Sequence, residues 1–282
     1  MPSMRAELLV GLFTALIFVS APVGAGTMPS VAFYYGNQPP LDELSAFDWV
    51  VLEPEYTTKK ALQRLSDSQV FAYVSVGEVE PSRSWMSKIP QEWILGGNPA
   101  WGSLVIDQSQ PDWPAFFVDE VITPLWEQGF RGFFLDTLDS YHLYAKGTKS
   151  RARQEAGQIK LIRTLKARYP EAKLFFNRGF EILPEVHELT MAVAAESLFA
   201  GWDPASGNFH QVSEADRTWL INKLNQVKNN YRIPIVAIDY LPPAERERAR
   251  EVAEKIQRLG FIPWVTNPEL NQLGVGSIEV MP

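Results

Sequence analysis

The residues best suited to chemistry in this sequence are carboxylates that end hydrophobic runs. The apolar run Gly132–Leu135 leads directly into Asp136, and Asp139 follows three residues later. The run Met191–Ala195 ends in the same way at Glu196. Carboxylates rarely end a buried strand unless a site requires them there. Asp136 and Glu196 are therefore the centre of a candidate active site.

A pair of carboxyl groups across a cleft is what glycoside hydrolysis requires. One must be protonated to assist the leaving oxygen, and the other must be ionised to attack the anomeric carbon or activate water. We expect the positive charge of Arg178 to keep Asp136 ionised, and the apolar run before Glu196 to raise the pKa of that carboxyl. With one strand between them, their backbones should lie roughly 10 Å apart. The sequence leaves open whether the reaction is retaining or inverting.

Other polar and aromatic residues lie at or just beyond the ends of the predicted strands, and we expect them to bind substrate. Capping a helix is the alternative role for any single carboxylate, and core packing is the alternative for any single ring. An aromatic ring in the cleft could also stack on a sugar and attract a protonated amine. The candidates are Tyr35, Glu53, Glu78, Asp139, Tyr141, Asn177, Arg178, Trp202, Asp239 and Tyr240.

Two other chemistries compete with this one. Carboxylates at such a site also hold Mg²⁺ in some enzymes, so a metal-dependent reaction is the main chemical alternative. His142, His187 and His210 are not spaced four residues apart, which argues against a zinc site. No Gly-x-Ser-x-Gly is present to support a serine hydrolase. We therefore expect no metal and no cofactor.

Short apolar runs alternate with helical patterns, which predicts a parallel sheet built from βα units. Eight such units in about 250 residues are typical of a (β/α)₈ TIM barrel, an α/β fold. A doubly wound open sheet is the alternative, but no Gly-x-Gly-x-x-Gly follows the first strand. Helices are predicted over 154–169, 214–227 and 244–259. The predicted strands are 31–35, 49–53, 70–76, 132–136, 174–177, 191–196, 234–239 and 261–266.

One connection in this pattern is unusually long. About fifty residues separate Gly77 from Gly132, and they include Trp85, Trp93, Trp101 and Trp113 and a possible short strand at 104–107. Connections of this length are usually functional or structured. The predicted architecture is therefore a single barrel domain with a long loop insertion after strand 3, on the face where barrel enzymes build their sites.

The first 25 residues resemble a secretory signal peptide. Arg5 precedes an apolar segment at Leu8–Val19, and Val23-Gly24-Ala25 is a small-residue cleavage site. A membrane anchor is the alternative, but the segment is shorter than the ~20 residues of a spanning helix. We expect residues 1–25 to be removed, residues 26–282 to form the barrel domain, and the mature protein to be periplasmic or secreted without stable membrane insertion.

The composition restricts the possible partners. The chain has no cysteine, which excludes disulfides and thiolate metal sites, and its net charge is −7 at pH 7. An acidic balance argues against nucleic acid and favours a neutral or cationic ligand.

Several motifs together resemble the endo-α-1,4-polygalactosaminidase family of glycoside hydrolases, over nearly all of residues 30–282. They are Ala72–Glu78, Asn98–Gly102, Gly132–Tyr141, Asn177–Phe180 and Glu196–Phe199. The resemblance implies a (β/α)₈ endo-glycosidase with Asp136 as nucleophile and Glu196 as acid/base. It also implies a partly deacetylated, galactosamine-rich exopolysaccharide as substrate, with the machinery that exports this polymer as a possible partner.

A barrel that binds and guides the polysaccharide without efficient cleavage is the alternative function. The presence of both acids favours the enzyme. The sequence leaves open the acetylation preference, the oligomeric state, and whether the chain acts alone or as part of a larger protein.

Overall fold

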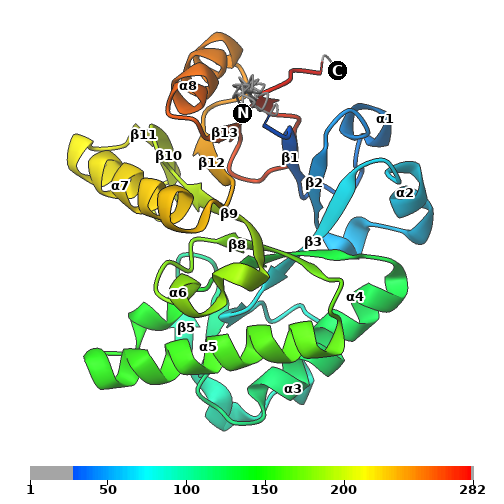
Figure 1. Cartoon of the computed structure of the whole chain (residues 1–282), viewed down its shortest axis with the longest axis vertical. Helices are drawn as coiled ribbons and strands as arrows, with labels where there is room; N and C mark the ends of the chain where they lie inside the picture. Colours follow the sequence, from blue (N-terminus) through cyan, green and yellow to red (C-terminus); the bar gives the residue numbers. More distant parts are fainter. Residues whose placement is uncertain (1–27, 281–282) are drawn as a thin grey trace, which may run out of the picture.

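The computed structural model describes residues 28–280, which form a ring of parallel strands surrounded by helices (Figure 1). The expected signal peptide lies outside the described residues. Each parallel strand except the last is hydrogen-bonded to the next one in the ring. The strands of the ring are β1 (Val31–Tyr34), β2 (Trp49–Leu52), β3 (Gln69–Ser75), β7 (Gly132–Asp136), β8 (Lys173–Asn177), β9 (Thr190–Glu196), β12 (Ile235–Tyr240) and β13 (Ile262–Thr266).

The ring closes between its first and last strands without a direct ladder among the described residues. Strand β14 (Val275–Gly276) pairs antiparallel with β13 beside β1. The backbone N–H of Tyr35 donates to the carbonyl of Leu270 over 2.6 Å. The predicted (β/α)₈ barrel is thus confirmed, and the open-sheet alternative is wrong. All eight predicted strands are present, with ends within two residues of those predicted.

Bulky rings fill the inside of the barrel. Phe33, Phe71, Phe134 and Phe175 come from four strands, and Phe134 and Phe175 meet edge to face with ring centroids 5.0 Å apart. Side chains alternate along a strand, so residues two further along point to the same side. Asp136 and Asn177 therefore stand above Phe134 and Phe175, at the carboxyl end of the barrel.

Helices cover the outside of the ring, with α3, α4 and α5 together on one side of it (Figure 1). Helix α3 continues into α4 through a π-helical turn at Val118–Ile122, and α6 is short. The predicted helices at 154–169, 214–227 and 244–259 are confirmed as α5, α7 and α8. The helices are α1 (Leu41–Leu44), α2 (Lys59–Arg64), α3 (Trp113–Phe117), α4 (Thr123–Gln128), α5 (Thr148–Arg168), α6 (Leu183–Val186), α7 (Glu214–Tyr231) and α8 (Arg246–Arg258).

The long insertion after β3 has structure of its own. It forms an antiparallel sheet of β4 (Glu78–Val79), β5 (Ile94–Asn98) and β6 (Ser103–Ile106), and β6 matches the predicted short strand. Gln154 on α5 fixes this sheet to the barrel, because its side chain accepts from the N–H of Gln108 and donates to Asp107. A hairpin of β10 (Ala200–Asp203) and β11 (Asn208–Gln211) follows β9 and was not predicted. Within residues 28–280, no helix combines the length and apolar character needed to cross a bilayer.

Gly77 is where the insertion leaves the barrel, beside the end of β7. A Cβ at Gly77 would lie 2.2 Å from the carbonyl oxygen of Thr137, so the backbone there leaves no room for a side chain. We predict that Gly77→Ala lowers the free energy of unfolding by about 1–3 kcal/mol, because overpacking forces the backbone apart. Urea unfolding followed by circular dichroism measures this change.

Gly97→Ala is the matched control, because the nearest atom to its added Cβ is 3.8 Å away. We expect that variant to stay within about 0.5 kcal/mol of the parent protein. Equal stabilities for the two variants would contradict the prediction.

Candidate active site

Asp136 and Glu196 meet above the barrel core through one amide group. The side-chain nitrogen of Asn177 donates to Oδ1 of Asp136 over 2.8 Å and to Oε1 of Glu196 over 2.9 Å. These two oxygens are therefore less than about 5.8 Å apart, whatever the angle at the nitrogen. Strands β7, β8 and β9 are neighbours in the ring, and each supplies one member of the trio. The structure thus brings the two acids together, as expected from the sequence.

Both carboxyl groups have raised pKa values. Burial raises the pKa of Asp136, while hydrogen bonds from the Thr137 backbone, Asn177 and Tyr73 oppose the increase. Burial also raises the pKa of Glu196, and the neighbouring charge of Asp136 raises it further. Tyr240, Arg178 and Asn177 lower it in part. The two groups therefore titrate as a pair in which the ionised form of Asp136 receives three hydrogen bonds and its charge favours the protonated form of Glu196.

Tyr73 is a residue of the site that sequence reasoning undervalued. Its hydroxyl donates to Oδ2 of Asp136 over 2.9 Å, which completes the hydrogen bonds to that carboxylate. Burial and the charge of Asp136 raise the pKa of Tyr73 well above its usual value, so the hydroxyl remains a donor. Its ring centroid lies 4.8 Å from that of Tyr35, another lining residue. The signal was available, since Tyr73 shares a strand face with Phe71.

Two residues next to the acids hold left-handed backbone conformations. Thr137 has φ 61° and Arg178 has φ 57°, and such values are unusual for residues other than glycine. The Thr137 hydroxyl is fixed by the N–H of Gly77 at 2.8 Å and by the Ser75 hydroxyl at 2.9 Å. These contacts hold in place the turn that follows Asp136. Because Gly77 is where the insertion begins, the insertion helps to position Asp136.

Arg178 does not act where the sequence suggested. Its guanidinium donates to the backbone carbonyl of Glu196 over 2.7 Å and lies 3.5 Å from Asp139. Its charge lowers the pKa of Glu196 and is not among the causes that shift the pKa of Asp136. The expectation that Arg178 keeps Asp136 ionised is therefore wrong, because the turn at Arg178 directs its side chain toward Asp139.

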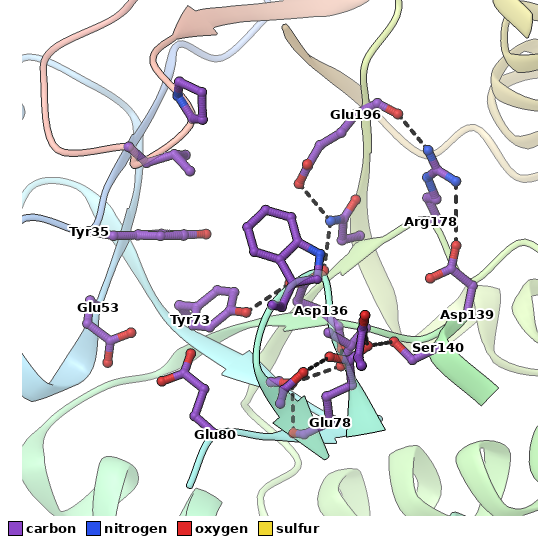
Figure 2. Close-up of a pocket in the computed structure, with 18 of the residues that line it drawn as sticks. Tyr35, Glu53, Tyr73, Glu78, Glu80, Asp136, Asp139, Ser140, Arg178 and Glu196 are labelled. Atoms are coloured by element: carbon purple, nitrogen blue, oxygen red, sulfur yellow. Dashed lines mark hydrogen bonds and ion pairs between the residues drawn. The ribbon is translucent and has the colours of Figure 1, made fainter. Parts of the chain in front are cut away.

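A cavity of about 760 Å³ surrounds these groups, and we call it the active-site cavity. Tyr35, Glu53, Tyr73 and Glu80 lie on one side of Asp136, with Glu196, Arg178 and Asp139 on the other (Figure 2). Seven carboxyl groups line it against two guanidinium groups, so its field is strongly negative. The carboxyl groups are those of Glu53, Glu55, Glu78, Glu80, Asp136, Asp139 and Glu196.

Glu53 and Glu78 line the cavity, but their carboxylates are hydrogen-bonded to other side chains of the protein. Arg83, 16% exposed, binds Glu53 through two bonds of 2.8 and 3.0 Å and lies near Glu55 and Glu80. Glu78, 5% exposed, accepts bonds from Asn98, Ser103 and Ser140. Glu78 thus joins the insertion to the loop after β7. Arg83 and Glu80 were missed by sequence reasoning because only the folded insertion brings them to the cleft.

Asp239 does not line the cleft, contrary to the sequence prediction. Its side chain is fully buried and accepts from the N–H groups of Leu198, Phe199 and Ala200 over 2.5–3.0 Å. Burial raises its pKa to about 6, although these donors oppose the increase. Tyr240 lines the cavity, so strand alternation places Asp239 on the opposite face. Asp239 positions the chain that follows Glu196.

Tyr141 is also absent from the cavity wall. It is 1% exposed, and its hydroxyl donates to Glu155 on α5 over 3.1 Å. The single turn of 3₁₀ helix at Ser140–Leu143 turns Tyr141 inward and presents His142 to the cavity. Trp202 borders a smaller neighbouring cavity rather than the active-site cavity itself. Among residues 28–280, no three His, Asp or Glu side chains are grouped to hold a metal ion.

A parallel barrel with a hydrogen-bonded acid pair at the carboxyl ends of its strands fits the architecture of a glycoside hydrolase. The chain belongs to Glycoside-hydrolase family GH114, whose model matches residues 21–279. The glycoside hydrolase domain of PelA from Pseudomonas aeruginosa is 41% identical and superposes with a TM-score of 0.82, over 89% of this chain and 99% of that one. The family resemblance seen in the sequence is thus confirmed.

Two more distant similarities were also found. Ega3 of Aspergillus fumigatus, solved in complex with galactosamine, is 15% identical with a TM-score of 0.66, over 88% of this chain and 94% of that one, and it supports the fold. An uncharacterized protein of Deinococcus radiodurans is 27% identical over 259 residues, or 81% of this chain and 76% of its own.

The role of Asp239 generates a prediction about stability. We expect Asp239→Asn to lower the free energy of unfolding by about 1–3 kcal/mol, because both carboxylate oxygens accept N–H bonds and an amide would turn its own N–H₂ against one of those donors. Thermal and urea unfolding measure the loss. Asp67→Asn, at an exposed position, is the control expected to change little.

Proposed function

We propose that this glycosidase hydrolyses α-1,4 linkages inside a partly deacetylated, galactosamine-rich exopolysaccharide, after export to the periplasm or the exterior. The observation that carries the proposal is the acid pair bridged by Asn177 within a strongly negative cavity. Free amines make such a polymer cationic, and a negative cleft raises the local concentration of a cationic chain. Membership of the family supports a glycosidase, and the solved complex of the similar Ega3 with galactosamine supports a galactosamine-type sugar.

The spacing of the pair favours a retaining reaction. Retaining enzymes hold their carboxyl groups about 5–5.5 Å apart, whereas inverting enzymes leave about 6.5–9.5 Å for a water molecule. The bridged oxygens of Asp136 and Glu196 are closer than about 5.8 Å, which leaves no such gap between them. We assign Asp136 as the nucleophile, because Tyr73 and Asn177 both donate to its carboxylate, and Glu196 as the acid that protonates the leaving oxygen and later activates water.

The central experiment mixes purified protein with a partly deacetylated α-1,4-galactosamine polymer and follows its shortening. Asp136→Asn and Glu196→Gln should each lower kcat by about a hundredfold or more, because each removes one half of the acid pair. Mass spectrometry of the oligosaccharides measures the rate, and proton NMR of the first product should show the α anomer.

Asp67→Asn and Glu251→Gln, at exposed positions away from the cavity, are the matched controls and should retain full activity. Cleavage that survives in both active-site variants would disprove the assignment. Binding of the polymer without cleavage by the native protein would instead support a guiding role.

The pH dependence should report the two carboxyl groups separately. Activity should fall at low pH as Asp136 is protonated and at high pH as Glu196 loses its proton, giving a bell-shaped profile. Tyr73→Phe removes a donor to the ionised form of Asp136, so the pKa of Asp136 rises. The acidic limb of kcat/KM should then move up by about one pH unit, which corresponds to ~1.4 kcal/mol.

Tyr34→Phe is the control, because the Tyr34 hydroxyl donates to the Gln38 carbonyl outside the cavity. That variant should leave both limbs in place. An acidic limb that does not move in Tyr73→Phe would contradict the assignment of this limb to Asp136.

A further inference from the structure

A second cavity of about 300 Å³ adjoins the active-site cavity, and we call it the side cavity. The two cavities share the walls formed by Trp101, Arg178, Glu196, Tyr240 and Pro268. The remainder of the side cavity is built by the segment from Ser197 to the start of α7. Its members there are Ser197, Trp202, His210, Val212 and Asp216.

The two cavities differ in which acid they touch. Glu196 borders both cavities, whereas Asp136 borders only the active-site cavity. In a carboxylate-pair glycosidase, the sugar that is attacked must contact both the nucleophile and the acid. The sugar that leaves needs only the acid, which protonates the oxygen joining the two rings. The contacts of Asp136 and Glu196 therefore indicate in which direction a polysaccharide would lie along the cleft.

Two tryptophans from distant parts of the chain meet at the side cavity, and one of them, Trp101, also borders the active-site cavity. Trp101 lies in the turn between β5 and β6 and is 61% exposed, and Trp202 lies on β10. Their ring centroids are 6.2 Å apart with the planes inclined at 45°. Both rings line the side cavity, where aromatic faces can stack on a sugar ring.

The hairpin that carries Trp202 leaves room for a further ring beside the cavity. Gly201 pairs with His210 across β10 and β11. A Cβ at Gly201 would lie 2.8 Å from the His210 imidazole, so glycine is what allows that ring to lie against the strand. Asp239 fixes the start of the same hairpin through the N–H of Ala200. The side cavity is thus formed by a braced hairpin and not by a loose loop.

We propose that the side cavity binds the leaving-group sugar, with Trp202 and His210 as its contacts and Trp101 over the bond that is cleaved. The active-site cavity then holds the sugar that is attacked and those on its non-reducing side. The proposal rests on the proposed function, since it assigns positions to the two halves of the same polysaccharide. Aromatic stacking in the side cavity binds the departing half of the chain.

The test compares a substrate that has a leaving-group sugar with one that lacks it. The first is the partly deacetylated α-1,4-galactosamine polymer, and the second is a short α-1,4-galactosamine oligomer carrying fluoride at its anomeric carbon. Fluoride leaves without occupying a sugar site. Trp202→Ala should lower kcat/KM for the polymer about tenfold and change kcat/KM for the fluoride less than twofold. His210→Ala, in the exposed β11 strand, should give the same pattern with a loss of several fold.

Two variants serve as controls. Glu55→Gln changes a group that borders the active-site cavity but not the side cavity, so it should lower kcat/KM for both substrates by the same factor. Trp219→Ala removes an exposed tryptophan of α7 that borders neither cavity and should alter neither value. Circular dichroism confirms that each variant is folded.

The outcomes separate the two proposals. If Trp202→Ala and His210→Ala reduce the fluoride reaction as much as the polymer reaction, the side cavity holds the attacked half and its assignment is overturned. If neither substrate is affected by either variant, the side cavity is not a sugar site. If the native protein cleaves neither substrate, the proposed function itself fails.

Discussion

The site depends on one amide group that holds two buried carboxyl groups together. Two such groups repel each other when both are ionised, and burial increases the cost of each charge. Asn177 offsets this cost with one N–H₂ group directed at both acids. Its Oδ1 is buried without a hydrogen-bond partner among the described residues, so the two acids alone orient the amide. The register of β7, β8 and β9 is what makes the bridge possible.

The turns beside this bridge store backbone strain that the surroundings must offset. Left-handed conformations at residues other than glycine cost about 1–3 kcal/mol each. Thr137 and Arg178 both adopt them, one residue after Asp136 and Asn177. Hydrogen bonds from Gly77 to the Thr137 hydroxyl, and from the Arg178 backbone to Ala194, hold the two turns. The insertion after β3 therefore supports Asp136 and also forms a wall of the cleft.

The sequence predicted the barrel and the acid pair because both follow from local pattern. Apolar runs ending in acids mark strand ends, and parallel strand ends converge in a barrel. Strand alternation would also have excluded Asp239 once Tyr240 was taken as a lining residue. The Trp101–Trp202 contact and the ion pairs of Arg83 depend on how the insertion and the β10–β11 hairpin fold back over the barrel. No local pattern encodes those long-range placements.

The excess of carboxyl groups in the cleft links substrate attraction to proton transfer. Arg83 neutralises part of the negative charge near Glu53, and Arg178 lies close to Asp139. Neither arginine therefore neutralises the charge of Asp136. The remaining negative field would attract the proposed cationic polymer, and the charge of Asp136 raises the pKa of Glu196. A bound ammonium group near Glu196 would lower that pKa again. Binding a cationic sugar thus favours release of the proton that the leaving oxygen must receive.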